Sequence, residues 1–429
     1  MAVGNEPRRR PAPLPKADGV APARQVAFAV LRRSDDGAYV DRALRGEATG
    51  LDPRDRALAK RLAFGTVQRR DTLDWVIDSR VERTLDPPVR DALRLGLYQL
   101  LYLDGIADHA AVGESVSLAT AARGKGAGGL VNAVLRRVQR EGAPLPDDIA
   151  PAGAAIRHSH PRWIVDRWWE ELGPDGARAL LAANNEPPEL TLRVNTLAPM
   201  DLGDIPGRRL GDAIVMEGGT DPATHPGWGA GAFVVQSRAA QAVSRLVDPQ
   251  PGERVLDLCA APGGKTTHLA ALMGGTGEVV AVERHPGRAA ALERTAARLH
   301  AGNVRVVVGD AAAFTDEEGF DRVLLDPPCS GLGTLRTHPD LRWRVTPQEV
   351  DALAAVQDRL LAAARRALRP GGAGRLVYSV CTISRREERL AGEDRLRTLP
   401  SVDGTDGFYI SWDGDGETGR SRPRVPELP

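Results

Sequence analysis

Two cysteines stand directly after apolar runs that are typical of buried strands. Cys329 follows the run 322–326 in the segment Leu-Asp-Pro-Pro-Cys-Ser, and Cys381 follows the run 375–380 in Tyr-Ser-Val-Cys-Thr. A thiolate is a strong nucleophile, so two thiols at neighbouring strand ends could act on one substrate. Each cysteine taken alone fits a buried structural thiol better. The placement of both cysteines at strand ends therefore indicates a catalytic role for the pair.

Acidic residues mark the same kind of position. Asp257, Glu283 and Asp326 close apolar runs, and Asp310 follows another after one glycine. Nucleoside-binding sheets place a carboxylate at the end of the second strand, where it binds ribose hydroxyls. Glu283 has that place here, and Asp310 could meet an adenine amine. The series favours a nucleoside cofactor.

A turn of small residues joins the first of these runs to a helix, whose first N–H groups would point at a bound ligand. The dinucleotide pattern G-x-G-x-x-G is absent, and the phosphate-loop pattern G-x-x-x-x-G-K-[ST] lacks only its first glycine. A third interpretation is an S-adenosylmethionine site, which needs a small-residue turn rather than a full phosphate cradle. The residues of this turn are Cys259, Ala260, Ala261, Pro262, Gly263, Gly264 and Lys265.

The two thiols have a chemical use beside such a cofactor. The C5 carbon of cytosine is a poor nucleophile, but addition of a thiolate to C6 makes C5 able to attack a methyl sulfonium. The C5 proton must then leave and the thiol be eliminated. A carboxyl group near N3, such as that of Asp326, would stabilise the adduct. The spacing alone does not show which cysteine is the nucleophile, and Cys259 fits a packed thiol.

The elements that must hold these residues follow from hydrophobic periodicity. Apolar runs at 254–258, 278–283, 304–308, 322–326 and 375–380 suit buried parallel strands, with amphipathic helices between them. The clearest helix begins at Thr346-Pro347-Gln348-Glu349, which is a capping box. These units predict an α/β fold with a doubly wound, mostly parallel sheet that binds ligands at its carboxyl edge.

The rest of the chain predicts further domains. Helical periodicity without strand alternation indicates an all-α domain before a Pro- and Ala-rich stretch, and an aromatic helix with short strand candidates follows. The expected divisions are a disordered arm at 1–20, the all-α domain at 21–140, a linker at 141–160, a small α+β subdomain at 161–236, the sheet domain at 237–412 and a tail at 413–429.

Composition limits the function classes. The 429 residues carry 57 Lys+Arg and 57 Asp+Glu, which excludes a histone-like protein or one with an acidic tail. Three widely spaced cysteines predict neither a disulfide framework nor a metal site, and they favour a reducing compartment. The first residues lack the apolar segment of a signal peptide, and no run is long enough to span a membrane. We therefore expect a cytoplasmic protein.

Together these motifs resemble the Fmu/Sun (NOL1/NOP2/Sun) family of RNA 5-methylcytosine methyltransferases, in its bacterial RsmB-type branch that acts on 16S ribosomal RNA. Residues 21–140 are similar to the NusB-like RNA-binding domain of that branch, including the run 129–137. Residues 333–340 match the segment that follows its fourth-strand motif, and Glu387 matches one position of the acidic run that it commonly has after the second cysteine.

The resemblance implies roles for individual residues. Cys381 would be the nucleophile, Cys329 would assist release, and Asp326 would act in catalysis and in cofactor binding. S-adenosylmethionine would be held by residues 259–265, Glu283, Arg288, Asp310 and Asp326. The partner would be 16S ribosomal RNA, unassembled or in a partly assembled small subunit, and we expect a monomer without metal. Arg136 and Arg137, which lie on a predicted helix, are expected to contact phosphates of the RNA.

Two other functions are compatible with parts of the sequence. A phosphate-loop ATP-binding protein would explain residues 259–265 but leaves Glu283 without a purpose. A non-catalytic NusB-like RNA-binding factor would explain the N-terminal helices but leaves the two strand-end cysteines unexplained.

Overall fold

The computed structural model describes residues 17–219, 221–370, 374–390 and 394–413. Backbone contacts divide the chain into two compact units. The first comprises the described residues up to Asn185 together with His338–Arg344, and the second comprises Glu186–Thr337 and the described residues from Val345 onward. The expected tail at 414–429 and residues 1–16 of the expected arm lie outside the described residues.

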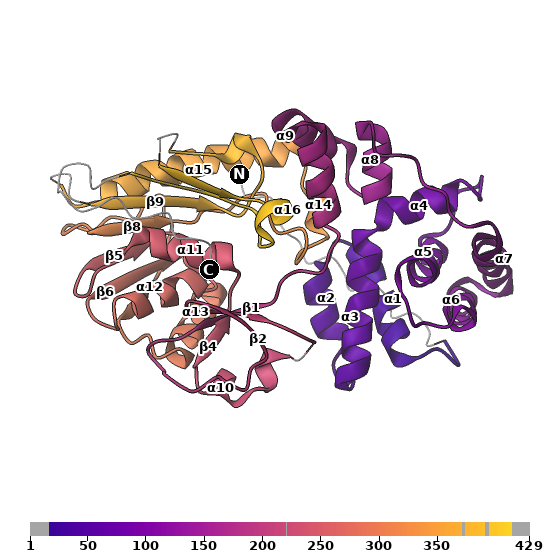
Figure 1. The fold of residues 1–429 in the computed structure, drawn as a ribbon, viewed down its shortest axis with the longest axis horizontal. Helices are drawn as coiled ribbons and strands as arrows, with labels where there is room; N and C mark the ends of the chain where they lie inside the picture. Colours follow the sequence, from indigo (N-terminus) through magenta and orange to yellow (C-terminus); the bar gives the residue numbers. More distant parts are fainter. Residues whose placement is uncertain (1–16, 220, 371–373, 391–393, 414–429) are drawn as a thin grey trace. The chain divides into compact units, whose positions relative to one another are not determined.

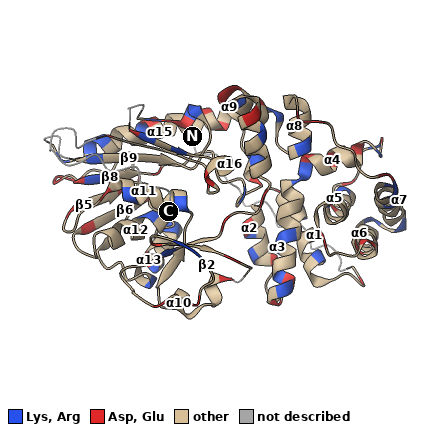
Figure 2. Cartoon of the chain, in the orientation of Figure 1, with Lys and Arg blue, Asp and Glu red and all other residues tan. Residues whose placement is uncertain are grey.

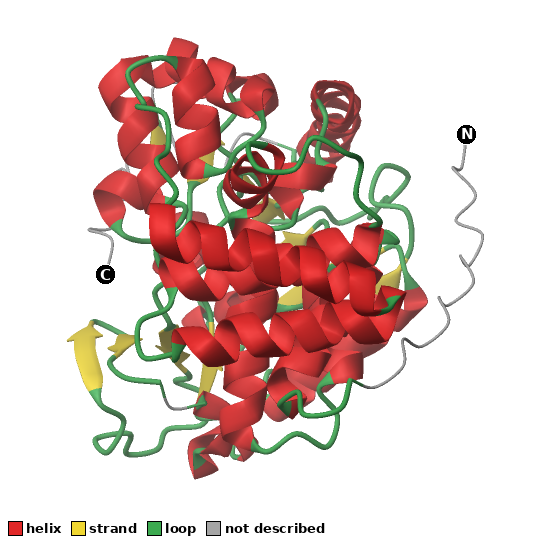
Figure 3. Ribbon diagram, turned by 90° about the vertical axis from the view of Figure 1, so that its right-hand side faces the viewer, coloured by secondary structure: helices red, strands yellow, loops and turns green. Residues whose placement is uncertain are grey.

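The first unit is helical throughout (Figures 1 and 3). Helix α5 lies at its centre and packs against α1, α3, α4, α6 and α7, because apolar side chains such as Leu93, Leu95 and Leu97 surround its whole circumference and are all buried. The all-α prediction is confirmed for this region. The helices are α1 Pro22–Asp35, α2 Val40–Glu47, α3 Pro53–Gln68, α4 Arg70–Asp78, α5 Pro87–Tyr102, α6 Asp108–Arg123, α7 Lys125–Glu141, α8 Pro151–His158 and α9 Arg162–Ala183.

Three predictions about the edges of this unit differ from the structure. Ala17 and Val20, inside the expected disordered arm, are buried in the helical core. The expected linker at 141–160 contains α8, which Pro151 begins and which packs on α4, where Thr72 Oγ1 donates to the carbonyl of Ile156 at 2.6 Å. The proline content of this stretch indicated a linker. Pro151, however, occupies the first position of a helix, where proline is favoured. The aromatic helix of the expected α+β subdomain is α9, which belongs to the first unit.

The second unit begins with a small antiparallel sheet. Its strands are β1 Thr191–Val194, β2 Gly207–Leu210, β3 Ala213–Met216 and β4 Phe233–Val235, in the order β2-β3-β1-β4. Leu192, Ile214 and Phe233 form its buried face. The short helix α10, Pro226–Gly229, lies between β3 and β4 in the chain.

The second unit continues with a seven-stranded sheet of order β10-β11-β9-β8-β5-β6-β7. The strands are β5 Arg254–Asp257, β6 Glu278–Glu283, β7 Val304–Val308, β8 Arg322–Leu325, β9 Arg375–Val380, β10 Arg395–Thr398 and β11 Phe408–Asp413. The strands from β9 to β7 in that order pair in parallel, while β10 and β11 pair antiparallel. The predicted mostly parallel α/β sheet is confirmed.

Helices cover both faces of this sheet because successive side chains of its strands point to opposite sides. Val255, Val279 and Leu324 pack with α11 Arg238–Val247 and α12 Gly264–Leu272 on one face. Their chain neighbours, such as Leu256 and Val323, pack with α15 Pro347–Ala367 on the other. Helix α13 Pro286–Arg298 contacts β6 and β7, and α16 Pro400–Asp403 precedes β11. The buried strands are therefore apolar on both sides.

Part of the segment between β8 and α15, residues 338–344, belongs to the first unit. Its helix α14, Leu341–Arg344, carries Arg342, which is fully buried and donates to the carbonyl oxygens of Ser159 at 3.0 Å and Asn184 at 3.2 Å. Burial lowers the pKa of Arg342 to about 9. The expected sheet domain at 237–412 is therefore interrupted at 338–344. Directly after it, α15 begins with the predicted capping box of Thr346 and Glu349.

No helix within the described residues is long and apolar enough to cross a membrane.

Candidate active site at the carboxyl edge of the sheet

The topology selects one edge of the sheet as the site. From β5 the chain proceeds through β6 to β7 on one side, and it returns to β8 and β9 on the other side of β5. The loops that leave β5 and β8 therefore diverge and open a crevice at the carboxyl ends of these strands. The loops after β5, β6, β8 and β9 carry most of the residues that the sequence selected.

The loop after β5 is fixed by backbone hydrogen bonds. Leu258 N donates to Leu324 O at 2.9 Å, and Ala260 N donates to Val282 O at 3.0 Å. Gly263 has φ of +99°, and a Cβ there would lie 3.1 Å from Leu292 Cγ, so the turn into α12 requires glycine. The loop therefore presents backbone, not side chains, at the start of a helix.

Asp257 has a buried carboxyl group at this edge of the sheet, and it is not among the cofactor-binding residues expected from the sequence. It ends β5, is buried, and accepts a hydrogen bond from Thr266 Oγ1 at 2.7 Å through one carboxyl oxygen. Its other oxygen, Oδ1, has no hydrogen-bond partner among the described residues. Burial raises the pKa of Asp257 to about 7, so this oxygen can accept or donate a hydrogen bond near neutral pH.

Glu283 and Arg288 lie beside this loop. Glu283 is the last residue of β6, is buried, and accepts a hydrogen bond from His285 N at 2.8 Å. Arg288 Nη2 donates to the carbonyl of Ala261 at 2.8 Å and lies 3.5 Å from the Glu283 carboxylate. Arg288 thus ties the loop after β5 to the end of β6. It acts on the loop rather than standing free in the crevice.

Asp310 differs from the other strand-end acids. It lies two residues beyond β7 and is exposed, and its carboxylate caps a turn by accepting from Ala312 N at 3.1 Å. The series of acids is therefore continuous in the sheet, but its members differ in burial.

Asp326, just after β8, is held by two donors. Lys265 Nζ donates to Oδ2 at 2.7 Å and Ser379 Oγ donates to Oδ1 at 2.7 Å. Burial opposes the charge of Lys265, but the neighbouring Asp326 carboxylate raises the pKa of the ammonium, and Cys381 acts in the same direction. Lys265 also lies 5.2 Å above the Phe408 ring. These contacts connect the loops after β5, β8 and β9.

The structure brings the two strand-end cysteines together. The Sγ atoms of Cys329 and Cys381 lie 3.3 Å apart, although the residues come from different loops. The hydrogen bond with Cys381, together with burial, raises the pKa of the Cys329 thiol well above its ordinary value. Cys329 therefore holds its proton more firmly than a free thiol and can donate its S–H to the Cys381 sulfur. Cys259 packs among apolar residues, and burial raises the pKa of its thiol as well.

A buried carboxylate joins the two cysteine loops. Glu387 is fully buried; its Oε1 accepts from Ser330 N at 2.8 Å and from Gln357 Nε2 at 3.1 Å. Its Oε2 accepts from Ser330 Oγ at 2.5 Å and from Thr382 Oγ1 at 3.0 Å. Ser330 and Thr382 directly follow the two cysteines. The sequence offered one signal for this role, the isolated match of Glu387 to the family's acidic run.

Comparison with known proteins matches three regions of the chain to known families. The family described as 16S rRNA methyltransferase RsmB/F matches residues 244–405, the NusB family matches residues 21–140, and the ferredoxin-like domain of RsmF/B-like methyltransferases matches residues 160–199. A probable ribosomal RNA small subunit methyltransferase B of Synechocystis is 38% identical, over 84% of this chain and 86% of the relative. The chain belongs to this methyltransferase family.

Other relatives extend the agreement. The probable enzyme of the same name from Bacillus subtilis is 33% identical over 90% of this chain and 97% of the relative. The crystal structure of PH0851 covers 92% of this chain at 25% identity with a TM-score of 0.76. The structure of NSun6 from Pyrococcus horikoshii with SFG shares the fold over 59% of this chain, at 21% identity and a TM-score of 0.54. The resemblance that the motifs indicated is thus confirmed.

Proposed function

We propose that the protein transfers a methyl group from S-adenosylmethionine to C5 of a cytosine in 16S ribosomal RNA, through a covalent adduct between Cys381 and C6. The observation that carries the proposal is the 3.3 Å approach of the Cys329 and Cys381 sulfurs at neighbouring strand ends. Membership of the ribosomal RNA methyltransferase family supports the substrate class.

The residues present suit the cofactor. The unpartnered Oδ1 of buried Asp257 and the glycine turn before α12 offer a polar contact and a side-chain-free surface. Residues 259–265, Glu283, Asp310 and Asp326 would hold S-adenosylmethionine, and Arg288 would position the loop. When bound, this cofactor supplies an electrophilic methyl group.

Cys381 would supply the nucleophile. Lys265 interacts electrostatically with Cys381, and Cys329 can donate a hydrogen bond to its sulfur, so a thiolate at Cys381 has two stabilising neighbours. The Cys381 sulfur forms a bond to C6. The electron pair of the C5–C6 double bond then shifts to the C4–C5 bond, and that of the C4–N3 double bond moves onto N3. C5 then becomes nucleophilic.

Cys329 would allow release. After C5 is methylated, a base must take the C5 proton, and the electrons of that C–H bond restore the double bond while the Cys381–C6 bond breaks. Once the sulfur of Cys381 is bonded to carbon it no longer carries charge. The largest influence that raises the pKa of Cys329 is then removed. Cys329 can then release its own proton to solvent water and, as a thiolate, take the C5 proton.

Asp326 would hold the base. Two donors, Lys265 Nζ and Ser379 Oγ, fix its carboxyl group. A carboxyl group beside N3 and the exocyclic amine would form hydrogen bonds that strengthen when the thiolate has added and the ring has gained electrons.

The helical unit would bind the RNA. Arg136 and Arg137 of α7 are exposed; Arg136 bonds to Gln139, and Arg137 pairs with Glu141 at 2.8 Å, a surface pair that is weak enough to exchange for phosphate. Figure 2 shows basic and acidic residues interspersed along the helices, as the equal numbers of both suggest.

Bisulfite sequencing of 16S ribosomal RNA tests the proposed function. RNA from a strain that lacks the protein should lose one protected cytosine, and a plasmid copy of the chain should restore it. The Cys381→Ala copy should not restore it. An unchanged methylation pattern in the deletion strain would contradict the proposal.

We expect Glu283→Ala to weaken S-adenosylmethionine binding. The substitution removes charge-assisted hydrogen bonds to the ribose, worth roughly 1.5–3 kcal/mol, so the Kd should rise at least about tenfold. Isothermal titration calorimetry measures this directly. Glu293→Ala, on the exposed side of α13, is the matched control and should leave the Kd unchanged. Equal affinities of both variants would remove Glu283 from the cofactor site.

Replacing Glu387 tests whether its carboxylate positions the two cysteine loops. Glu387→Ala leaves the buried donors of Ser330, Thr382 and Gln357 without their acceptor, which should lower the free energy of unfolding by about 3 kcal/mol. Because the two cysteine loops lose their link, kcat should fall by about tenfold or more in protein that is still folded. Glu387→Gln keeps an acceptor for Ser330 N, so it should recover most of the free energy of unfolding and most of kcat.

Glu388→Gln is the control for this experiment, since Glu388 pairs with Arg397 at the surface of the same segment. Chemical denaturation measures stability and a methylation assay measures kcat. Full kcat in folded Glu387→Ala protein would show that the carboxylate does not position the cysteines.

A further inference from the structure

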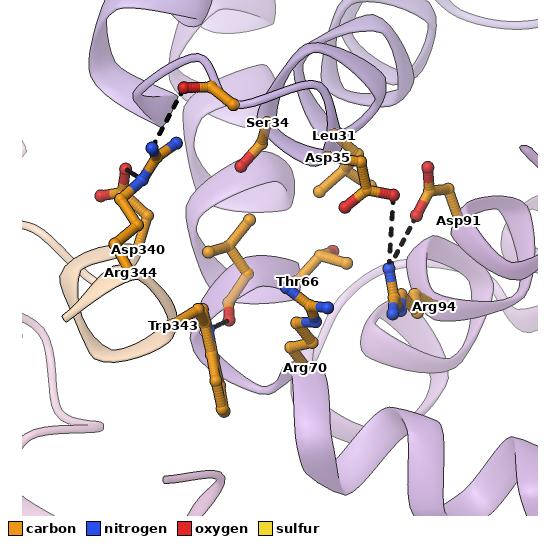
Figure 4. A pocket seen from close by; sticks show the side chains of 12 residues that line it. Leu31, Ser34, Asp35, Thr66, Arg70, Asp91, Arg94, Asp340, Trp343 and Arg344 are labelled. Atoms are coloured by element: carbon orange, nitrogen blue, oxygen red, sulfur yellow. Dashed lines mark hydrogen bonds and ion pairs between the residues drawn. The ribbon is translucent and has the colours of Figure 1, made fainter. Parts of the chain in front are cut away.

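The helical unit contains a polar cavity apart from the cysteine site. Its volume is about 340 Å³. Residues of α1, α3, α4, α5 and the segment 338–344 surround it, and all of them belong to the first unit (Figure 4). A cavity of this size accommodates a small planar ligand. Nothing in the proposed methyl transfer uses it.

One wall of the cavity is acidic. Asp91 is fully buried and accepts hydrogen bonds from Arg32 at 3.0 Å and from Arg94 at 2.9 Å. Asp35 lies nearby and makes longer ion pairs with the same arginines, at 3.5 Å from Arg32 and 3.8 Å from Arg94. Burial and the neighbouring charge of Asp35 raise the pKa of Asp91 to about 6. The contacts of Asp35 with the two arginines are therefore longer than those of Asp91.

The other walls offer donors and a flat surface. The guanidinium of Arg70 lies 5.8 Å from the centre of the Trp343 ring, and this side chain makes no hydrogen bond or ion pair within the part of the chain that the structure describes. Trp343 is fixed because its indole Nε1 donates to Val67 O at 2.7 Å. Thr66 is fully buried, lines the cavity, and its Oγ1 has no partner among the described residues.

These groups define the ligand by its chemistry. It must be planar to lie against the indole, carry donors for Asp35, and carry acceptors for Arg70 and Thr66. A phosphate would be repelled by the two aspartates, and a simple cation by Arg70 and Arg94. Among the RNA bases, guanine alone places two adjacent N–H donors on one edge and the acceptors O6 and N7, which suit a guanidinium, on another.

We propose that this cavity binds an unpaired guanine base of the RNA, with Asp35 on its N1–H and amino group, Arg70 on O6 and N7, and the ring against Trp343. Aromatic stacking and recognition of base edges are how proteins read single-stranded RNA. That the guanine belongs to RNA rests on the proposed function, whereas recognition of the base itself does not.

Fluorescence anisotropy of the full-length protein with labelled nine-residue RNAs tests this. The RNAs are all-uridine except for a central guanosine, inosine, adenosine or uridine. We expect the guanosine RNA to bind at least fivefold more tightly than the adenosine and uridine RNAs. Inosine lacks the amino group, so its RNA should fall between them. Equal affinities for all four RNAs would overturn the proposal.

Two variants locate the effect. Arg70→Ala and Asp35→Ala should each reduce the guanosine preference to less than twofold. Both should stay folded, because Arg70 has no polar partner within the described residues and loss of Asp35 relieves repulsion with Asp91. Arg54→Ala removes an exposed charge from the other end of α3 and should keep the preference. A preference that persists in both cavity variants would overturn the assignment.

Competition separates the possible sources of the base. Guanosine monophosphate at millimolar concentration should displace the guanosine RNA, and cytidine monophosphate should not. Guanosine triphosphate binding more than tenfold tighter than the RNA would assign the cavity to a free nucleotide and overturn the RNA source. None of these measurements involves methyl transfer, so their outcome is independent of whether cytosine C5 is the methylated atom.

Discussion

Replacing Cys381 by alanine should abolish both methylation and the covalent protein–RNA adduct. The Cys381 sulfur lies 3.3 Å from that of Cys329 and interacts electrostatically with Lys265, two neighbours that would stabilise a thiolate formed there. Without a nucleophile on C6, the C5 carbon cannot attack a methyl sulfonium. Loss of a nucleophile typically costs several orders of magnitude, so we expect a fall in kcat of at least about 10⁴-fold.

Cys329→Ala should give the opposite adduct result. Attack and methyl transfer still occur once, but the C5 proton is not removed, and the protein remains attached to its RNA. A slowly migrating band on a denaturing gel reports this adduct. Calorimetry with S-adenosylmethionine shows whether each variant keeps its cofactor site. An adduct with Cys381→Ala and none with Cys329→Ala would reverse the two roles.

Asp326→Ala should be the second most damaging substitution. It removes the acceptor of Lys265 and Ser379 and leaves a partly buried ammonium unpaired. It also removes the group that would hold the base as charge develops, which typically costs about 10²–10³-fold in kcat. Adduct formation should fall with kcat, because Asp326 acts at the addition step.

Asp326→Asn separates these effects. The amide keeps the shape and one of the two acceptors, so the protein should be more stable than Asp326→Ala while kcat remains strongly reduced. Ser379→Ala removes one hydrogen bond to Asp326 and should cost about tenfold or less. Normal single-turnover methylation by Asp326→Ala would exclude this carboxyl group from the chemistry.

The parallel strands were predictable because burial on both faces makes them apolar throughout. The runs that became β5, β6, β8 and β9 have that pattern, whereas β7 is apolar in sequence but lies at the edge of the sheet and is only partly buried. Strand β10 lacks the apolar pattern, since Arg395 and Arg397 alternate with other residues at the edge of the sheet. Its place depends on pairing with β11, a contact across the chain that local periodicity does not encode.

Long-range contacts also explain the misplaced boundaries. Arg342 looks like a surface residue in the sequence, yet carbonyl oxygens of residues far away in the chain surround it and bring 338–344 into the helical unit. The proline of α8 indicated a linker by composition. Its packing against α4 is what makes it a helix of the core.

The candidate site was predictable where residue type and strand end coincide. The approach of Cys329 and Cys381 follows from β8 and β9 being neighbours in the sheet. Glu387 could not be assigned in this way, because a glutamate among arginines indicates a solvated segment. Only the fold shows that its carboxylate is buried between the two cysteine loops.

The most direct measurement uses 16S ribosomal RNA transcribed with 5-fluorocytidine. Fluorine replaces the C5 hydrogen that must leave as a proton, so release is blocked after methyl transfer. Wild-type protein with S-adenosylmethionine should form a stable adduct, and mass spectrometry of its peptides should place the nucleotide on Cys381. Attachment at Cys329, or no adduct while ordinary RNA is methylated, would contradict the proposed mechanism.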